Sequence, residues 1–482
     1  MHTLSAPPEL RRLVTGCLLA SFRGTTAPPW LLQWIEAGLG GVTLFDVNIG
    51  DDVGALTSSL RSVRDDVVIA LDEEGGDVTR LEVATGSSSP GNAALGTIDD
   101  IALTREVATA MGAQLIAAGV DLDLAPCADV NSNPANPVIG VRSFGADPAL
   151  VARHVAAFVA GLHGAGVAAC VKHFPGHGDT TVDSHLDLPV VEVDVEQLRR
   201  RELVPFVGAI DANVDAVMTS HLVVPAVDDA PATVSRRFLV DVLRRELGFD
   251  GAVVTDALDM RGISAARGIP SAAVASLTAG ADVLCLGARQ DETVLDAVAA
   301  AILAAVTEGT LTEDRLVEAA TRRAVLRRAR EAAATLDPAV GRRAAALAVQ
   351  VEGVLAGPVG GAHVIECRPP HDMAQGGVPW GLGEPLRALD SATTVSSVTT
   401  LGRVEPAPPG QPLVVVVRNA GRHRWQLEVL RELAMARPDL IVVEMGWPGP
   451  DPLPGAVVIR TFGASRASGE AVARLLVGAR DG

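Results

Sequence analysis

Short apolar runs alternate with longer segments of helical period over roughly the first 300 residues, and this rhythm limits the possible folds more than any other feature. The apolar runs have the length of buried strands and occupy residues 41–45, 67–71, 122–125, 167–171, 216–219, 252–255 and 283–286. Helical segments lie between them, such as residues 101–118, 148–165, 195–212 and 236–246. This alternation predicts a parallel sheet, and its length fits a (β/α)8 TIM-like barrel whose eighth strand is degenerate. A doubly wound sheet is the alternative fold.

Polar residues follow most of the predicted strands. They include Asp72, Glu73 and Glu74 after residues 67–71, Asp129 and Asn131 after 122–125, Ser220 and His221 after 216–219, and Asp256 after 252–255. The carboxyl ends of barrel strands meet at one mouth, so these side chains are expected to converge there. Core packing does not explain such a pattern, which is typical of an enzyme.

The most polar of these segments is residues 172–185, KHFPGHGDTTVDSH. Its proline and glycines prevent a regular helix, so the apolar run before it is predicted to continue into a polar loop, where we expect the active site. The alternatives are a solvated connection and a metal site, whose possible ligands are His173, His177, Asp179, Asp183 and His185. The metal site is the weaker interpretation, because Pro175 and Gly176 keep the first two histidines off one helical face and the loop lacks cysteine.

Charge and missing motifs exclude several classes of partner. The chain has 58 acidic and 40 basic residues, a net charge of −18 and no basic patch interleaved with aromatic residues, which argues against nucleic acid. Neither GxGxxG after the first run nor GxxxxGK(S/T) is present, so no nucleotide cofactor is expected. No apolar run approaches the length of a membrane span. Five scattered cysteines and the lack of a clear signal-peptide cleavage site predict a cytoplasmic protein.

A second domain is expected after the barrel, because 482 residues exceed what one hydrophobic core usually organises. A helix rich in Ala, Leu and Arg is predicted to end before Asp337 and Pro338. We therefore expect the barrel at residues 1–335 and a smaller α/β sandwich at residues 336–482. Within the sandwich, residues 369–412 are rich in Pro, Gly, Ser and Thr and are expected to form a surface excursion without a firm element.

The polar residues supply acid and base chemistry without a metal or cofactor. Asp256, in VVTDALDM, directly follows a strand and is a candidate nucleophile or base. Asp183 and His185 are two residues apart, so the carboxylate can orient and polarise the imidazole. Double-displacement glycoside hydrolysis requires a carboxylate nucleophile and a separate proton donor. Glu74 competes with His185 for the role of donor. The side chains able to hold a hydroxylated substrate are Asp72, Arg80, Arg142, Lys172 and His173.

Several positions also have structural interpretations. Arg80 and Arg142 can pair with nearby carboxylates, since buried arginines usually do so. His177 is expected to brace the loop rather than to touch substrate. His221 can hydrogen-bond the nucleophile or fill the barrel mouth, and Asp259, already in the turn after its strand, is the competing nucleophile.

Four segments together resemble the β-N-acetylglucosaminidases of glycoside hydrolase family 3, namely KHFPGHGDTTVDSH, LDEEGGDVTRL, NPVIGVRSFG and VVTDALDM. The resemblance covers the whole barrel. It implies hydrolysis of terminal β-N-acetylhexosamine with retention, with Asp256 as nucleophile, His185 as acid/base and Asp183 as its partner. The sugar-binding residues that it implies are Asp72, Arg80, Arg142, Lys172 and His173. One departure is Asp77, which stands where the family commonly has arginine.

The expected function is a cytoplasmic, retaining exo-β-N-acetylglucosaminidase, that is, a β-N-acetylhexosaminidase, acting on small carbohydrates derived from peptidoglycan or chitin. A phosphorylase on the same scaffold is the alternative, because a histidine acid/base does not repel phosphate as a carboxylate would. A non-catalytic sugar-binding protein is the third interpretation, which the intact catalytic positions disfavour. The aglycone and the oligomeric state do not follow from the sequence.

Overall fold

The computed structural model describes residues 6–288, 290–328, 337, 339–371, 373–400, 410–449 and 452–479. The chain divides into two compact units. The first unit comprises residues 1–73, 104–132 and 146–336, and the second comprises residues 74–103, 133–145 and 337–482. The domain boundary expected between residues 335 and 336 lies outside the described residues and stays a prediction.

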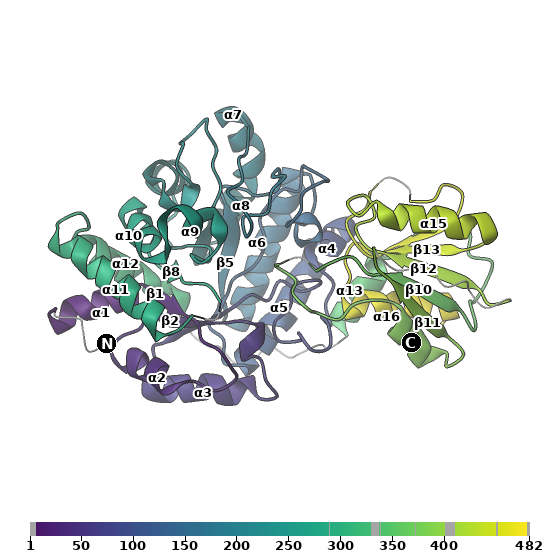
Figure 1. Ribbon diagram of the computed structural model, residues 1–482, viewed down its shortest axis with the longest axis horizontal. Coiled ribbons are helices and arrows are strands. Elements are labelled where there is room, and N and C mark those ends of the chain that lie inside the picture. The colour runs from purple at the N-terminus through teal and green to yellow at the C-terminus, as the bar shows by residue number, and fades with distance from the viewer. Residues whose placement is uncertain are drawn as a thin grey trace. The chain divides into compact units, whose positions relative to one another are not determined.

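The first unit is built on an eight-stranded parallel sheet in the order β7-β6-β5-β4-β3-β2-β1-β8 (Figure 1). Its strands are β1 (Leu18–Ala20), β2 (Gly41–Leu44), β3 (Val68–Leu71), β4 (Leu122–Asp123), β5 (Ala168–Phe174), β6 (Ala216–Thr219), β7 (Ala252–Val254) and β8 (Leu284–Cys285). A parallel bridge between Val254 and Val283 joins the two ends of this order, so the sheet closes into a barrel. The predicted barrel is therefore confirmed.

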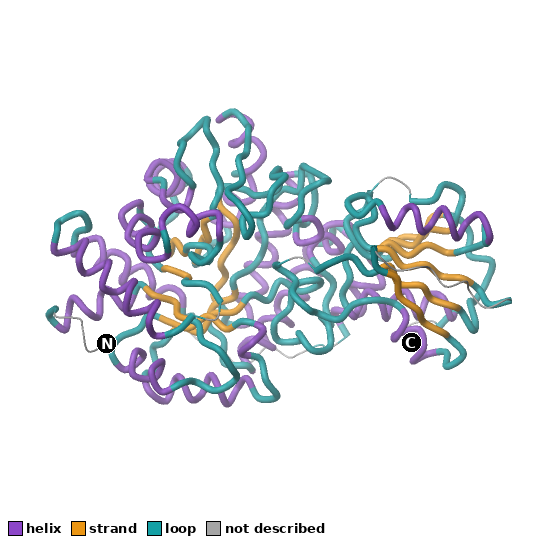
Figure 2. Tube along the Cα trace, in the orientation of Figure 1, coloured by secondary structure: helices purple, strands orange, loops and turns teal. Residues whose placement is uncertain are grey.

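Helices accompany these strands and lie outside them in Figure 2. They are α1 (Pro8–Gly16), α2 (Pro29–Glu36), α3 (Val53–Val63), α5 (Ile101–Ala117), α6 (Pro148–Ala165), α7 (Val195–Gln197), α8 (Val204–Asp211), α9 (Arg261–Arg267), α10 (Ile269–Ala279), α11 (Glu292–Thr307) and α12 (Glu313–Arg323). Two further helical segments are π-helical, Leu198–Glu202 and Arg237–Glu246. The strands are buried on both faces because helices cover them outside and side chains fill the barrel inside.

The eighth strand is β1, which no separate apolar run had indicated. It has three residues, all buried, and lies within the apolar stretch LVTGCLLASF. Leu19 pairs with Gly41 of β2 on one side and with Cys285 of β8 on the other. Its side chain also belongs to the barrel interior, together with Val68, Leu122, Ala168, Ala216, Ala252 and Val283.

The second unit contains a six-stranded sheet in the order β11-β10-β12-β13-β14-β9, in which only β9 is antiparallel. Its strands are β9 (Gln350–Glu352), β10 (His363–Cys367), β11 (Thr394–Val398), β12 (Leu413–Val417), β13 (Ile441–Glu444) and β14 (Val457–Arg460). Its helices are α4 (Asn92–Ile98), α13 (Val340–Ala348), α14 (Gly383–Leu389), α15 (Trp425–Ala436) and α16 (Arg466–Val477). One core packs α14 and α16 on the sheet, and a second core packs α15 on it. Figure 1 shows α15 and α16 on opposite faces of the sheet. This α/β sandwich confirms the predicted second fold.

One expectation about this unit is wrong. Residues 369–412 were predicted to hold no firm element, yet they contain helix α14 and strand β11. Leu382 and Leu386 are buried in the same core as Val364 of β10, and β11 pairs with β10 along five residues from Thr394 to Val398. Apolar burial and strand pairing therefore override the local abundance of Pro, Gly, Ser and Thr. Residues 401–409 lie outside the described part of the chain.

Candidate active site

The polar segment predicted from residue 172 begins inside a strand. Strand β5 continues to Phe174, and Lys172 and His173 are buried within it. The chain leaves the strand at Pro175 and then passes close to the backbone of another segment. A Cβ atom on Gly178 would lie 1.7 Å from the carbonyl oxygen of Val130, so glycine alone fits this contact.

Lys172 and Asp72 form an ion pair at the ends of two strands. Lys172 Nζ lies 2.6 Å from Asp72 Oδ1, and the two side chains are 3% and 17% exposed. Asp72 directly follows β3, so the pair links the carboxyl ends of β3 and β5. Both were predicted sugar-binding residues, and the structure brings them together. Their polar atoms can donate to and accept from the hydroxyl groups of one small polar ligand.

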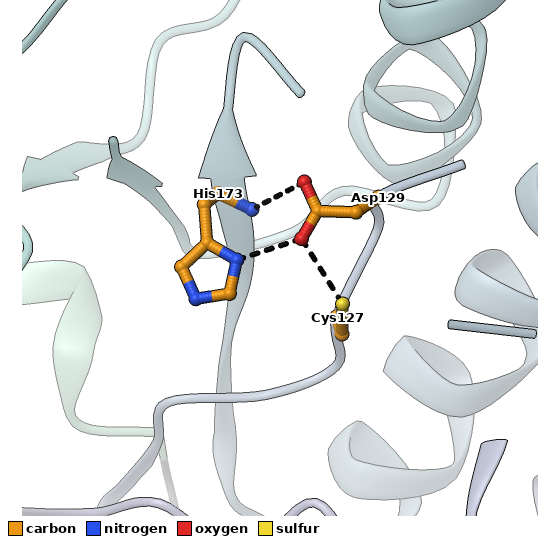
Figure 3. A group of neighbouring side chains, drawn as sticks. All are labelled: Cys127, Asp129 and His173. Carbon is orange, nitrogen blue, oxygen red and sulfur yellow. Dashed lines mark hydrogen bonds and ion pairs between the residues drawn. The ribbon is translucent and has the colours of Figure 1, made fainter. Parts of the chain in front are cut away.

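Asp129 fixes the orientation of His173. Its Oδ2 lies 2.7 Å from His173 Nδ1 and 3.1 Å from Cys127 Sγ, as Figure 3 shows. Its Oδ1 accepts from the backbone N–H of His177 at 2.6 Å. Burial opposes ionisation of Asp129, but the two histidines and these hydrogen bonds outweigh it and lower the pKa of the carboxyl. With Asp129 ionised, His173 donates through Nδ1, which fixes its ring.

The same three side chains are the candidate metal ligands of the site. The ligand atoms of Cys127, Asp129 and His173 all lie within 4.8 Å of one another. Tetrahedral zinc with N and O ligands at about 2.0 Å separates those ligand atoms by about 3.3 Å. The observed separation of 2.7 Å between His173 Nδ1 and Asp129 Oδ2 is a hydrogen-bond distance instead. In this structure the three side chains form a hydrogen-bonded network.

His185 and Asp183 form the pair that their spacing predicted. His185 Nδ1 lies 2.7 Å from Asp183 Oδ1, which also accepts from the backbone N–H of His185 at 2.9 Å. The His185 side chain is 27% exposed, so a substrate can reach it. Burial opposes ionisation of Asp183, but its hydrogen bond to His185 and the charge of that ring outweigh it and lower the pKa of the carboxyl. Asp183 is thus an anion that can stabilise a protonated His185.

His177 braces this loop, as expected. Its Nε2 lies 3.1 Å from Ser184 Oγ and its Nδ1 lies 2.7 Å from Thr180 Oγ1. Burial lowers the pKa of His177 to about 4, so the ring is neutral near pH 7. A neutral ring with hydroxyl groups on both nitrogens holds the loop together without adding charge to the site.

Asp256 follows strand β7 and is partly exposed. Burial opposes its ionisation, but His221, His173 and His185 outweigh that effect and lower the pKa of its carboxyl. The pKa of Asp259, the competing nucleophile, shifts in the opposite direction. Burial and the charge of Asp256 raise the pKa of Asp259 to about 6. Asp256 is therefore the better nucleophile of the two, because only the ionised form attacks.

His221 contacts the residue after Asp256 rather than its carboxylate. His221 Nε2 donates to the carbonyl oxygen of Ala257 at 3.0 Å, and its Nδ1 lies 2.8 Å from Thr233 Oγ1. The backbone N–H of Ala257 donates to Asp256 Oδ1 at 2.8 Å. Burial lowers the pKa of His221, and Thr233 Oγ1 also donates to the carbonyl oxygen of Ser220 at 3.0 Å. Sequence reasoning missed Thr233, which lies 12 residues from His221 along the chain.

Two more polar groups of the first unit were missed by sequence reasoning. Asp123 lies within β4, fully buried, where burial raises its pKa well above the ordinary value. A charged residue inside an apolar strand is the signal that could have identified it. The second is Arg201, which donates to Asp179 of the loop after β5 at 2.6 Å and to Glu202 at 2.5 Å. No sequence motif indicates a role for Arg201.

Arg80 and Arg142 belong to the second unit, and their roles in sugar binding stay predictions. Arg142 makes two parallel hydrogen bonds to Glu74, from Nε at 2.8 Å and from Nη2 at 2.7 Å. Both oxygens of Glu74 are thus acceptors, which is unsuited to a proton donor. Arg80 donates to the carbonyl oxygen of Ala374 at 3.0 Å. Asp77, the departure from the family pattern, has its charge compensated by Arg418 at 2.5 Å.

The first unit thus brings together six of the eight predicted site residues. They are Asp72, Lys172, His173, Asp183, His185 and Asp256, joined by the ion pairs and electrostatic interactions given above. Within the described residues no helix is both long and apolar enough to cross a lipid bilayer.

The chain resembles known proteins both in sequence and in fold. The model of the glycosyl hydrolase family 3 N terminal domain matches residues 33–327. A beta-hexosaminidase of Stenotrophomonas maltophilia is 37% identical over 276 residues, which are 55% of this chain and 82% of that protein. Beta-hexosaminidase A of Pseudoalteromonas piscicida is 39% identical over 285 residues, or 54% of this chain, and the match spans about half, 48%, of that relative. The solved family 3 beta-N-acetylglucosaminidase of Paenibacillus sp. str. FPU-7 superposes with a TM-score of 0.85 at 33% identity, covering 98% of this chain and 97% of that one.

Proposed function

Because the chain belongs to glycosyl hydrolase family 3, we propose that it is a retaining exo-β-N-acetylglucosaminidase. Its proposed substrates are peptidoglycan fragments or chitooligosaccharides that end in β-linked N-acetylglucosamine. The names of the Stenotrophomonas and Paenibacillus proteins support this substrate class. The five cysteines, all free and buried, support a reducing compartment, and we assign the protein to the cytoplasm.

One observation carries the proposal. The carboxylate of Asp256 lies in the electrostatic field of His185, and Asp183 holds His185 at 2.7 Å. A carboxylate nucleophile with a separate, oriented proton donor is what double displacement requires. The donor is an imidazole, whose ordinary pKa near 6.5 lets it give and then take a proton close to neutral pH.

In the first step, Asp256 attacks the anomeric carbon and the bond from that carbon to the glycosidic oxygen breaks. His185 transfers the proton on Nε2 to the departing oxygen, which leaves as an alcohol. The ionised Asp183 stabilises the protonated ring before this transfer and fixes which nitrogen faces the substrate. The product of the step is a glycosyl ester of Asp256.

In the second step, water attacks the same carbon and His185 accepts the proton that the water releases. The ester bond breaks and Asp256 leaves as a carboxylate, so two inversions give net retention. Lys172, Asp72 and His173 hold the sugar hydroxyl groups in this scheme, and we assign Arg80 and Arg142 to the same task because they stand in the family motifs.

Product identification with and without phosphate tests the proposal. An aryl N-acetyl-β-glucosaminide should give free N-acetylglucosamine at a rate that phosphate does not change. N-acetylglucosamine 1-phosphate formed in proportion to phosphate would instead identify a phosphorylase, a reaction that the uncharged form of His185 permits. No product under either condition would contradict both enzymes and leave a sugar-binding protein.

A further inference from the structure

The second unit contains a pocket that the proposed chemistry does not use. Its volume is about 580 Å³, which lies within the range of small-molecule sites. Helix α14 with the segment before it contributes one wall, and helix α16 contributes charged side chains. The apolar part of the lining includes Pro379, Pro385 and Leu389. All lining residues belong to this unit.

A buried charge network holds part of this pocket in place. The Trp380 ring has the guanidinium of Arg368 at 4.5 Å and that of Arg418 at 4.9 Å from its centroid. Arg418 in turn pairs with the buried Asp77 at 2.5 Å. Glu366, which is 4% exposed, pairs with Arg368. A lining fixed in this way loses little side-chain entropy when a ligand binds.

The backbone beside the pocket is fixed by the same glutamate. Glu366 Oε1 accepts from the N–H groups of Leu382 and Gly383, each at 2.9 Å. These bonds secure the start of α14, whose later residues Pro385 and Leu389 line the apolar wall. The pocket is therefore preorganised by polar contacts beneath its surface.

The lining of the pocket has more basic than acidic side chains. Four arginines face three glutamates, although the whole chain carries a net charge of −18. Glu366 is matched by Arg368, and Glu470 is matched by Arg466 at 3.1 Å. Arg342 and Arg474 are exposed, and within the described part of the chain neither guanidinium group has a hydrogen bond or ion pair. Two guanidinium groups are thus available to an anion.

We propose that this pocket binds an acidic monosaccharide, with its carboxylate or phosphate at Arg342 and Arg474. Guanidinium groups bind both oxyanions through paired N–H donors. The carboxylates of Glu384 and Glu470 accept from sugar hydroxyl groups, while the C–H face of the ring packs on Pro379 and the rest of the apolar wall. The proposal does not rest on the glycosidase function.

Calorimetric titration of the full chain with glucuronate and with glucose 6-phosphate tests this binding. These probes lack the N-acetyl group of the proposed substrate, and neutral glucose is the uncharged control. We expect one or both acids to bind, and the double variant Arg342→Gln with Arg474→Gln to weaken that binding at least tenfold. The neighbouring exposed Arg343 does not line the pocket, so Arg343→Gln is the matched control and should bind as the wild type does.

The identity of the bound acid separates a sugar phosphate from a uronic acid. Turnover of the aryl N-acetyl-β-glucosaminide by each variant shows that the protein is folded, and we expect it to be unchanged. Equal affinity of the wild type and the double variant for the acids would overturn the proposal, as would tight binding of glucose. Absence of binding by either acid would overturn it too.

Discussion

His221 is connected to Asp256 through the backbone of a single residue. The carbonyl oxygen of Ala257 accepts from His221 Nε2 at 3.0 Å, and the N–H of Ala257 donates to Asp256 Oδ1 at 2.8 Å. His221 therefore sets where the Ala257 backbone lies, and that backbone sets where the carboxylate points. Misplacing a reacting group by about 1 Å can cost about a hundredfold in rate.

Replacing His221 should therefore impair kcat more than KM. We expect His221→Phe to lower kcat by about 10- to 100-fold, because the Ala257 carbonyl loses its donor and the Asp256 carboxylate is no longer held in one position. Thr233→Val, which removes the partner of His221 Nδ1, should act in the same direction but less strongly. Steady-state kinetics on an aryl substrate measures both constants. An unchanged kcat in the His221 variant would show that this contact does not position the nucleophile.

Replacement by asparagine should affect kcat very differently at Asp256 and at Asp259. Asp256→Asn removes the attacking group, and we expect kcat to fall by at least about a thousandfold. Asp259 has a pKa raised to about 6 and accepts from Gln290 at 3.0 Å, so Asp259→Asn should cost less than about tenfold. Mass spectrometry with a slow fluorinated substrate locates the glycosyl ester. Finding the ester on Asp259 would reverse this assignment.

His185 should be needed most where the leaving group is poor. His185→Ala should lower kcat/KM for an alkyl or sugar aglycone by about 10²- to 10⁴-fold, because that oxygen must be protonated as it departs. A nitrophenol leaves without a proton, so its first step should be nearly unaffected. Azide should then accelerate turnover of the nitrophenyl substrate, since it attacks the glycosyl ester without a general base. Equal losses for both substrates and no response to azide would argue against His185 as acid/base.

Glu202 should make the stability of the protein depend on pH. Its side chain is fully buried against Gly176, and its Oε2 has no hydrogen-bond partner among the described residues. Burial raises the pKa of Glu202 to about 7 from 4.5 in the unfolded chain. Its contribution to stability is thus fully present below about pH 4.5 and is lost as the pH rises through about 7.

Glu202→Gln should therefore gain stability relative to the wild type between pH 5 and pH 8, by up to about 3 kcal/mol in the free energy of unfolding. Urea denaturation at the two pH values measures the difference. The matched control is Glu246→Gln, a glutamate that pairs with Arg199 on the surface and should matter by less than about 1 kcal/mol at either pH. A Glu202→Gln effect that does not change with pH would contradict the prediction.

The local sequence pattern was enough to predict seven of the eight barrel strands, β2 to β8. These strands stand out because burial on both faces requires a largely apolar run, as in β3, whose four residues are all apolar. Strand β1 does not, because its three residues merge with the apolar stretch around α1. In residues 369–412 the composition indicates a loop, and only the pairing of β11 with β10 makes a strand of it.

The contacts of the candidate site fall into the same two groups, those that a local sequence pattern predicts and those that it does not. Asp183 and His185 interact with a near neighbour, so their spacing was sufficient to predict the contact. Asp129 was recognised only as a polar residue after a strand, because its partners His173 and His177 lie 44 and 48 residues further along the chain. Thr233 and Arg201 act through contacts of the folded chain that no motif encodes.

The dependence of the loop after β5 on Asp129 has a consequence for protein engineering. Asp129 accepts from the backbone of His173 and of His177, and Gly178 lies against the carbonyl oxygen of Val130. The loop after β5 therefore depends on contacts with the segment after β4 for its position. Grafting residues 172–185 alone onto another barrel would transfer the sequence of the loop without its anchor, whereas grafting residues 127–130 with them would carry the anchor and the glycine contact as well.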